Sequence, residues 1–326
     1  MIVKPLPLDE AVGHILVHNQ TGADGRRILR KGKTLAAGDV ALLQELGKTQ
    51  VFVAILEAAD LDENEAARRL GELLTAPGIT AGKAITGRVN LVAETAGVFK
   101  VKVEALLDLN EQAGITLGTL PTNSLVEPGQ GLGTLKIIPY SLPQAVLETA
   151  EVIIRRQAPL LELKPFVVKQ AVLITTGSRE AREKVVGSFA PALRDRLARY
   201  GTALAEGPFV AEDEQEISAA LDQVMADGAE LILIAGETSI MDTDDITPRA
   251  IKAAGGELVH HGVPVEPGNL LLLAYHGQTP IVGAPGCARS PSFNVIDMVL
   301  PRLASGERLA RRDLLALGHG GFLKSA

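Results

Sequence analysis

The segment 231–250, LILIAGETSIMDTDDITPRA, constrains the fold more than any other part of this chain. A short apolar run typical of a strand leads into a polar loop that contains Gly236, Thr238, Ser239, Asp242, Asp244 and Asp245. A helix should follow, with Thr247 as its N-cap and Pro248 at its first position. Free backbone N–H groups and the helix dipole favour an anion at such a helix start. The segment therefore predicts an anion-binding loop, and its carboxylates suggest an accompanying hard cation such as Mg²⁺.

The composition limits the classes of function. The net charge is −7, aromatic residues make up 3% and there is no Trp, which argues against nucleic-acid binding. Apolar runs such as Leu270–Ala274 are too short to cross a bilayer. The single cysteine, Cys287, cannot form an internal disulfide, and the first ten residues lack the apolar core of a signal peptide. We therefore expect a cytoplasmic protein that binds neither nucleic acid nor membrane.

The second half of the chain alternates strand and helix patterns, which predicts an α/β fold. Strands are expected at 171–176, 202–205, 230–235, 258–260, 270–274 and 280–283, and helices at 179–200, 212–226, 248–254 and 292–303. This alternation predicts a mostly parallel sheet covered by helices on both faces, a three-layer αβα arrangement. The first half is rich in β-branched residues and turns. We predict a β-rich N-terminal region 1–165, an α/β domain 166–305 and a C-terminal tail 306–326.

Three loops should meet at one edge of this sheet. They are 175–178, 236–245 and 285–291, and each follows a predicted strand and leads into a helix. Ligands of parallel sheets bind at the carboxyl ends of the strands. Glycines and hydroxyl groups in all three loops therefore predict one pocket for a polyanionic ligand.

These segments resemble the molybdenum-cofactor-binding fold of molybdopterin adenylyltransferases, molybdopterin molybdenumtransferases and competence-damage-inducible proteins. The matching pieces are VLITTGS at 172–178, AGETSIMDTDDITPRAI at 235–251 and LLLLAYHGQTPIVGAPGC at 270–287. Further segments, including PLDEAVGHILVHN, VNLVAETAGVFKV and LGHGGFLK, look like a bacterial subgroup of molybdopterin-binding proteins. The resemblance implies that the ligand is molybdopterin or its nucleotide.

The resemblance also implies roles for individual residues. Cofactor-binding residues would be Thr175, Thr176, Gly177, Ser178, Gly236, Thr238, Ser239, Asp242, Thr247, Pro285, Gly286 and Ser290. Asp244 and Asp245 occupy the acidic positions where related enzymes place Mg²⁺ or a catalytic carboxylate. Two positions depart from the family pattern. Glu237 stands where a second glycine is usual and would repel a phosphate unless it turns away, and Cys287 replaces an asparagine.

Other interpretations of these residues remain open. Acidic residues at a helix start are often explained by the helix dipole alone. Cys287 is more readily a small buried apolar residue than a nucleophile or molybdenum ligand, although Arg289 lies close in sequence. Arg308, Arg311 and Arg312 fit a solvated helix face, or a surface that docks a molybdoenzyme or its chaperone.

Three functions therefore compete. The first is a molybdopterin-binding protein for cofactor assembly, storage or delivery, which could extend to a transferase that inserts molybdenum into adenylated molybdopterin. The second is a Mg²⁺-dependent nucleotide pyrophosphatase of the competence-damage-inducible type. The third is a non-catalytic regulatory module that keeps the fold. Relatives of this fold commonly form dimers or trimers, so we also expect a homo-oligomer.

Overall fold

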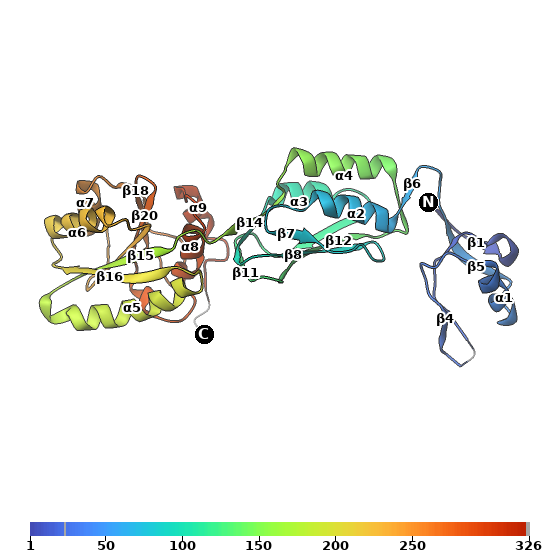
Figure 1. The fold of residues 1–326 in the computed structure, drawn as a ribbon, viewed down its shortest axis with the longest axis horizontal. Coiled ribbons are helices and arrows are strands. Elements are labelled where there is room, and N and C mark those ends of the chain that lie inside the picture. Colours follow the sequence, from blue (N-terminus) through green and yellow to red (C-terminus); the bar gives the residue numbers. More distant parts are fainter. Residues whose placement is uncertain (23, 324–326) are drawn as a thin grey trace. The chain divides into compact units, whose positions relative to one another are not determined.

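The computed structural model describes residues 1–22 and 24–323, which form two compact units. Unit 1 comprises Met1–Thr95 and Phe99–Leu163, and unit 2 comprises Ala96–Val98 and the chain from Lys164 onward. Figure 1 shows the elements of each unit along the chain. No helix in the described residues is long and apolar enough to span a membrane. The last three residues of the predicted tail 306–326 lie outside the described residues.

Unit 1 begins with a small β-rich portion. Its elements are β1 (Ile2–Pro7), β2 (Ile15–Leu16), β3 (Gln20–Thr21), β4 (Arg27–Leu29), α1 (Ala37–Glu45) and β5 (Gln50–Ile55). Strands β1, β5 and β2 form an antiparallel sheet in that order, and β3 pairs with β4. Buried leucines and valines, among them Leu16, Leu35, Leu43 and Val53, form a separate hydrophobic core in this portion.

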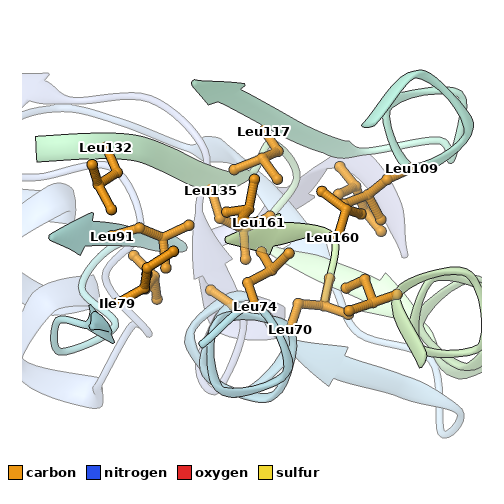
Figure 2. Packing of buried hydrophobic residues seen from close by; sticks show 14 of the residues in the cluster. Leu70, Leu74, Ile79, Leu91, Leu109, Leu117, Leu132, Leu135, Leu160 and Leu161 are labelled. Carbon is orange, nitrogen blue, oxygen red and sulfur yellow. The ribbon is translucent and has the colours of Figure 1, made fainter. Parts of the chain in front are cut away.

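The remainder of unit 1 packs three helices with short strands. The elements are β6 (Asp60–Asp62), α2 (Glu63–Leu73), β7 (Ile79–Ala81), β8 (Arg88–Ala93), β9 (Gly97–Val101), α3 (Val103–Asn110), β10 (Ile115–Thr119), β11 (Ser124–Val126), β12 (Gly131–Ile137), β13 (Ser141–Pro143), α4 (Gln144–Arg156) and β14 (Leu161–Pro165), of which β9 begins and β14 ends in residues assigned to unit 2. Strands β10, β12, β8 and β7 form an antiparallel sheet in that order. Figure 2 shows Leu70 of α2 and Leu91, Leu117 and Leu135 of this sheet pointing into one interior.

Unit 2 is built on a six-stranded sheet. Its strands are β15 (Gln170–Thr176), β16 (Ala203–Val210), β17 (Leu231–Gly236), β18 (Glu257–His261), β19 (Leu272–His276) and β20 (Thr279–Gly283). The order is β16-β15-β17-β20-β19-β18, with the first four strands parallel and the last two antiparallel to their neighbours. The long apolar runs of β15 and β17 are buried on both faces, as parallel strands usually are.

Helices cover both faces of this sheet. They are α5 (Arg182–Ala198), α6 (Glu214–Ala226), α7 (Ile246–Ala253), α8 (Val295–Ala304) and α9 (Arg311–Ala316), with short 3-10 helices η2 (Arg179–Ala181) and η3 (Gly286–Arg289). Figure 1 shows α6 and α7 on one side of the sheet and α5 on the other. Val172, Ile174 and Ile232 of the strands pack with apolar residues of α6 and α7. The predicted α/β class, a mostly parallel sheet between helical layers with a β-rich N-terminal region, is confirmed.

The start of α7 differs from its prediction. Asp245 is the N-cap, so the assignment of Thr247 as N-cap and Pro248 as the first helical residue is wrong. The helix begins two residues earlier because the Arg249 amide donates to the Asp245 carbonyl at 3.1 Å. Pro248 is then the third helical residue, which is tolerated because the N–H groups of the first turn have no partner within the helix.

Candidate functional site

Strand-end loops of unit 2 border a cavity at the carboxyl edge of the sheet. Thr176 and Gly236 pair at the ends of β15 and β17. Ala284 directly follows β20, and its amide donates a hydrogen bond to the Ile234 carbonyl of β17. The cavity holds about 220 Å³ and is lined by Thr176, Glu212, Ile234, Gly236, Thr238, Ser239, Ile240, Met241, Asp245, Ile246, Thr247 and Ala284. We call it the strand-end pocket. It has the position that ligand sites take in parallel sheets.

The alternation of side chains along β15 separates its two threonines. Thr176 lines the strand-end pocket, whereas Thr175 lines a second cavity of about 510 Å³ together with residues of α5 and β16. This follows from the strand geometry, because neighbouring side chains point to opposite faces. Both threonines are at least 97% buried, and neither hydroxyl has a hydrogen bond within the described part of the chain. Among the described residues, the fully enclosed side-chain oxygen without a partner is that of Tyr200, so the Thr176 hydroxyl is open to the strand-end pocket and available to a ligand there.

Several backbone amides of the first two loops already bind carboxylates of the protein. Glu237 Oε2 accepts hydrogen bonds from the Ser178 amide at 3.0 Å and the Ser178 hydroxyl at 2.9 Å. Glu212 Oε1 accepts from the Thr238 amide at 3.0 Å, and both of its oxygens accept from the Thr238 hydroxyl at 2.9 Å. These hydrogen bonds, first that from the Ser178 amide, lower the pKa of Glu237. Both carboxylates therefore take donors that an anionic ligand would otherwise use.

The acidic loop between β17 and α7 is closed on itself. Asp245 Oδ2 accepts from the Met241 amide at 2.6 Å and the Asp242 amide at 3.0 Å. Asp242 in turn accepts from the Asp244 amide at 2.8 Å. The amide bonds from Met241 and Asp242 lower the pKa of Asp245. Asp242 and Asp245 thus shape the loop, in keeping with the tendency of aspartates to bind nearby amides.

Four other amides of this region remain available to a ligand. They belong to Ser239, Ile240, Ile246 and Thr247, which all line the strand-end pocket. None of these amides has a hydrogen bond within the residues that the structure describes. Two of them, at Ile246 and Thr247, are the first amides of α7, where the helix dipole also favours negative charge. These amides are free to bind an anionic group.

Asp244 and Asp245 have separate surroundings. The Asp244 side chain is 84% exposed and lies 3.8 Å from Lys252 Nζ, while Asp245 turns to the Met241 and Asp242 amides. Among residues 1–22 and 24–323, no group of three or more His, Cys, Asp or Glu side chains could hold a metal ion.

A buried arginine fixes the third loop. Arg196 of α5 is 4% exposed and binds both oxygens of Asp297, at 3.0 and 3.2 Å. Its guanidinium also donates to the carbonyls of Ala288, Ser290 and Ser292. The Arg196 side chain thus connects three backbone carbonyls between η3 and α8 with the Asp297 carboxylate of α8. Sequence reasoning missed this residue.

The three predicted residues of the third loop lie outside the lining of the strand-end pocket. Pro285 is the N-cap of η3, and Gly286 is its first residue. The Ser290 carbonyl binds Arg196, and its hydroxyl accepts from the Ser292 amide at 3.2 Å. Of this segment, Ala284 lines the pocket. Gly177, Ser178, Asp242 and Asp244 also lie outside the pocket lining, whereas Thr176, Gly236, Thr238, Ser239, Asp245 and Thr247 are brought together in it.

The unit that carries this pocket is similar to a known family. Residues 172–305 match the family described as "Probable molybdopterin binding domain". The match spans 134 of 326 residues, so it describes the second unit and not the whole chain. Residues 5–55 match a family described as a domain of unknown function, DUF8806. The search of curated proteins gives no match.

Solved structures similar to this chain align with less than half of it. One is a molybdopterin biosynthesis protein from Mycobacterium abscessus, 16% identical, with a TM-score of 0.31 over 43% of this chain and 93% of that one. The molybdopterin biosynthesis enzyme MoaB from Thermus thermophilus is 21% identical, with a TM-score of 0.30 over 43% and 98%. CinA from Thermoplasma acidophilum, a protein with unknown function, is 19% identical, with a TM-score of 0.28 over 42% and 95%.

Cys287 and Arg289 lie in the third loop of unit 2. Burial raises the pKa of the half-buried Cys287 thiol, which keeps it protonated at neutral pH. Arg289 stands over the Phe189 ring at 4.7 Å and donates to the Gly286 carbonyl. Neither the thiol nor this arginine lines the strand-end pocket.

Proposed function

We propose that the second unit binds molybdopterin in the strand-end pocket, with the ligand's phosphate at the N-terminus of α7. The observation that carries this proposal is the pocket's set of unused donors inside a molybdopterin-binding domain. Four unpaired amides and the unpaired Thr176 hydroxyl belong to residues that line one cavity. A phosphate accepts several hydrogen bonds at once, and a helix N-terminus attracts its charge.

The size of the pocket indicates which part of the ligand it holds. Its 220 Å³ is below the roughly 300–1,000 Å³ of most small-molecule sites. We infer that the phosphate and its neighbouring atoms enter the pocket, while the pterin lies across the open mouth. Such binding is sufficient for assembly, storage or delivery of the cofactor.

Molybdenum insertion would require more than binding. It would add the predicted catalytic carboxylates Asp244 and Asp245, and a Mg²⁺ ion that accompanies the phosphate. Mg²⁺ commonly uses one or two protein carboxylates and completes its shell with phosphate and water. The exposed Asp244 carboxylate is the better placed of the two, because Asp245 Oδ2 already binds two amides. Intact insertion activity in Asp245→Asn would contradict a catalytic role for Asp245.

The two threonines of β15 provide a matched test of the binding site. Thr176→Val removes a hydroxyl that has no partner in the described structure, so it should not lower stability. It should weaken molybdopterin binding about tenfold or more, the usual effect of losing a hydrogen bond to a charged group. Thr175→Val makes the same change in the other cavity and should leave the affinity unchanged.

Calorimetric titration with molybdopterin measures both variants against the unaltered protein. Equal affinities in all three proteins, or a larger loss in Thr175→Val, would contradict the proposed position of the ligand. Failure of the unaltered protein to bind molybdopterin would contradict the function itself. A homo-oligomer and a molybdoenzyme or chaperone partner stay predictions, and light scattering of the purified protein tests the first.

A further inference from the structure

Two carboxylates hold donors of the strand-end loops: Glu212 lines the strand-end pocket, and Glu237, next in sequence to Gly236 of the pocket, lines a separate cavity of about 50 Å³. Glu212 binds the amide and hydroxyl of Thr238, and Glu237 binds those of Ser178. Each pair of donors has the form that binds a phosphate oxygen elsewhere in proteins. A carboxylate thus stands at each of two positions where a second phosphate would be bound.

The glutamate carboxylates lie very close to the backbone of Gly177 and Gly236. A Cβ atom added to Gly177 would lie 3.1 Å from Glu237 Oε2. One added to Gly236 would lie 3.2 Å from Glu212 Oε1 and 2.6 Å from Thr176 Oγ1. The glycines leave space for close approach to the backbone, and the two glutamates fill it.

A ligand with one phosphate and a ligand with two therefore meet different surroundings. The first phosphate finds the free amides of Ser239, Ile240, Ile246 and Thr247. A second phosphate joined to it would meet the Glu212 carboxylate at Thr238 or the Glu237 carboxylate at Ser178. Like charges repel, and the amides there are already bonded, so a diphosphate would have to displace a carboxylate.

We propose that Glu212 and Glu237 determine specificity, so that the pocket binds a phosphate monoester and excludes a diphosphate-linked nucleotide. This inference rests on the proposed function, because it assigns the pocket to molybdopterin and not to its nucleotide form. The unused Thr176 hydroxyl, 98% buried and facing the pocket, independently indicates that a ligand belongs there.

The test compares inorganic phosphate with inorganic pyrophosphate by calorimetric titration of the full chain. The unaltered protein should bind pyrophosphate no more tightly than phosphate. Glu212→Ala and Glu237→Ala each free an amide and remove a negative charge, so the ratio of pyrophosphate to phosphate affinity should rise about tenfold in each. Glu237→Gln, which keeps an acceptor oxygen for Ser178, should give a smaller rise.

Glu214→Ala is the matched control. Glu214 lies two residues after Glu212 and is ion-paired with Arg249 at 2.9 Å, but it binds no loop amide. Its loss removes the same charge, so a mere change in the local field would raise the ratio in this variant too. An equal rise in Glu214→Ala, or an unchanged ratio in both Glu212→Ala and Glu237→Ala, overturns the proposal.

Molybdopterin titrations of the same samples separate this inference from the function on which it rests. If the ratio of pyrophosphate to phosphate affinity is unchanged in Glu212→Ala and Glu237→Ala while the protein still binds molybdopterin, the specificity role is wrong and the proposed function stands. A tenfold change without molybdopterin binding would remove the function, while the role of the two carboxylates against diphosphates would stand.

Discussion

Replacement of Arg196 by methionine should be among the most damaging single changes in unit 2. The guanidinium and the Asp297 carboxylate are both more than 90% buried, and they are joined by two hydrogen bonds. Methionine fills a similar volume but leaves Asp297 charged in a buried site. Removing one partner of a buried ion pair typically costs about 3–5 kcal/mol of unfolding free energy. The three loop carbonyls that lose their donor place the expected loss at the upper end of that range.

Arg194 provides the control on the same helix. It pairs with Glu206 at 2.6 Å, but both side chains are about half exposed. Exposed ion pairs contribute about 0–1 kcal/mol, so Arg194→Met should cost less than about 1 kcal/mol. Urea unfolding of the full chain, followed by tyrosine fluorescence, measures both variants; two of the three tyrosines lie in unit 2. Similar midpoints for the two variants would refute the reasoning.

The pair can also be isolated by a double-mutant cycle. Asp297→Asn removes the charge while its side-chain oxygen can still accept from the Asn294 amide. If the buried charge dominates the loss, Arg196→Met combined with Asp297→Asn should be less destabilised than the sum of the single variants, by about 1–3 kcal/mol. Additive losses would show that the loop carbonyls, and not the ion pair, carry the effect.

Three further predictions test other features of unit 2. Tyr200→Phe removes a buried hydroxyl that has no hydrogen-bond partner in the described structure, so thermal unfolding should show equal or higher stability. Tyr275→Phe loses the hydrogen bond that the Leu309 amide donates to its hydroxyl, so it should lower the unfolding free energy by about 1 kcal/mol. Gly187→Ala, in open space within α5, should raise the unfolding free energy by about 0.5–1 kcal/mol. Gly236→Ala should lower the stability and weaken molybdopterin binding, because its Cβ would lie 2.6 Å from the Thr176 hydroxyl oxygen. Because the pKa of Asp245 is lowered from 3.8, its bonds to loop amides should persist above pH 3.8 and be lost as pH falls through the lower folded value, which amide hydrogen exchange in the loop can follow.

Much of unit 2 could be predicted because its sequence signals are local. The apolar runs 171–176 and 230–235 correspond to β15 and β17 within one residue at each end. The helical spacing of Val185, Phe189 and Leu193 fits the buried face of α5. Glycine and hydroxyl residues after the strands predicted the edge where the pocket lies. The sequence pattern could not predict which residues of each loop line the pocket.

The missed residues depend on contacts between distant segments. Arg196 lies seven residues after Phe189, on the helix face that otherwise carries apolar residues. A charged residue at such a position signals a buried ion pair, but its partner, Asp297, is 101 residues away. Glu212 belongs to an acidic run, 212–214, in which any member could have been the helix cap. Asp213 takes that role, and this leaves Glu212 outside the helix with its carboxylate at Thr238.

Glu237 shows how a departure from a family pattern acquires a physical meaning. From the sequence, a glutamate in the phosphate-binding loop could only be described as repulsive unless it turned away. In the structure it turns to Ser178, and its carboxylate binds the donors that a phosphate would need. The hydrogen bonds lower its pKa, so it stays ionised at neutral pH and keeps that position. Glu237 therefore leaves the free amides at the start of α7 untouched, and under the proposed specificity it acts only against a second phosphate.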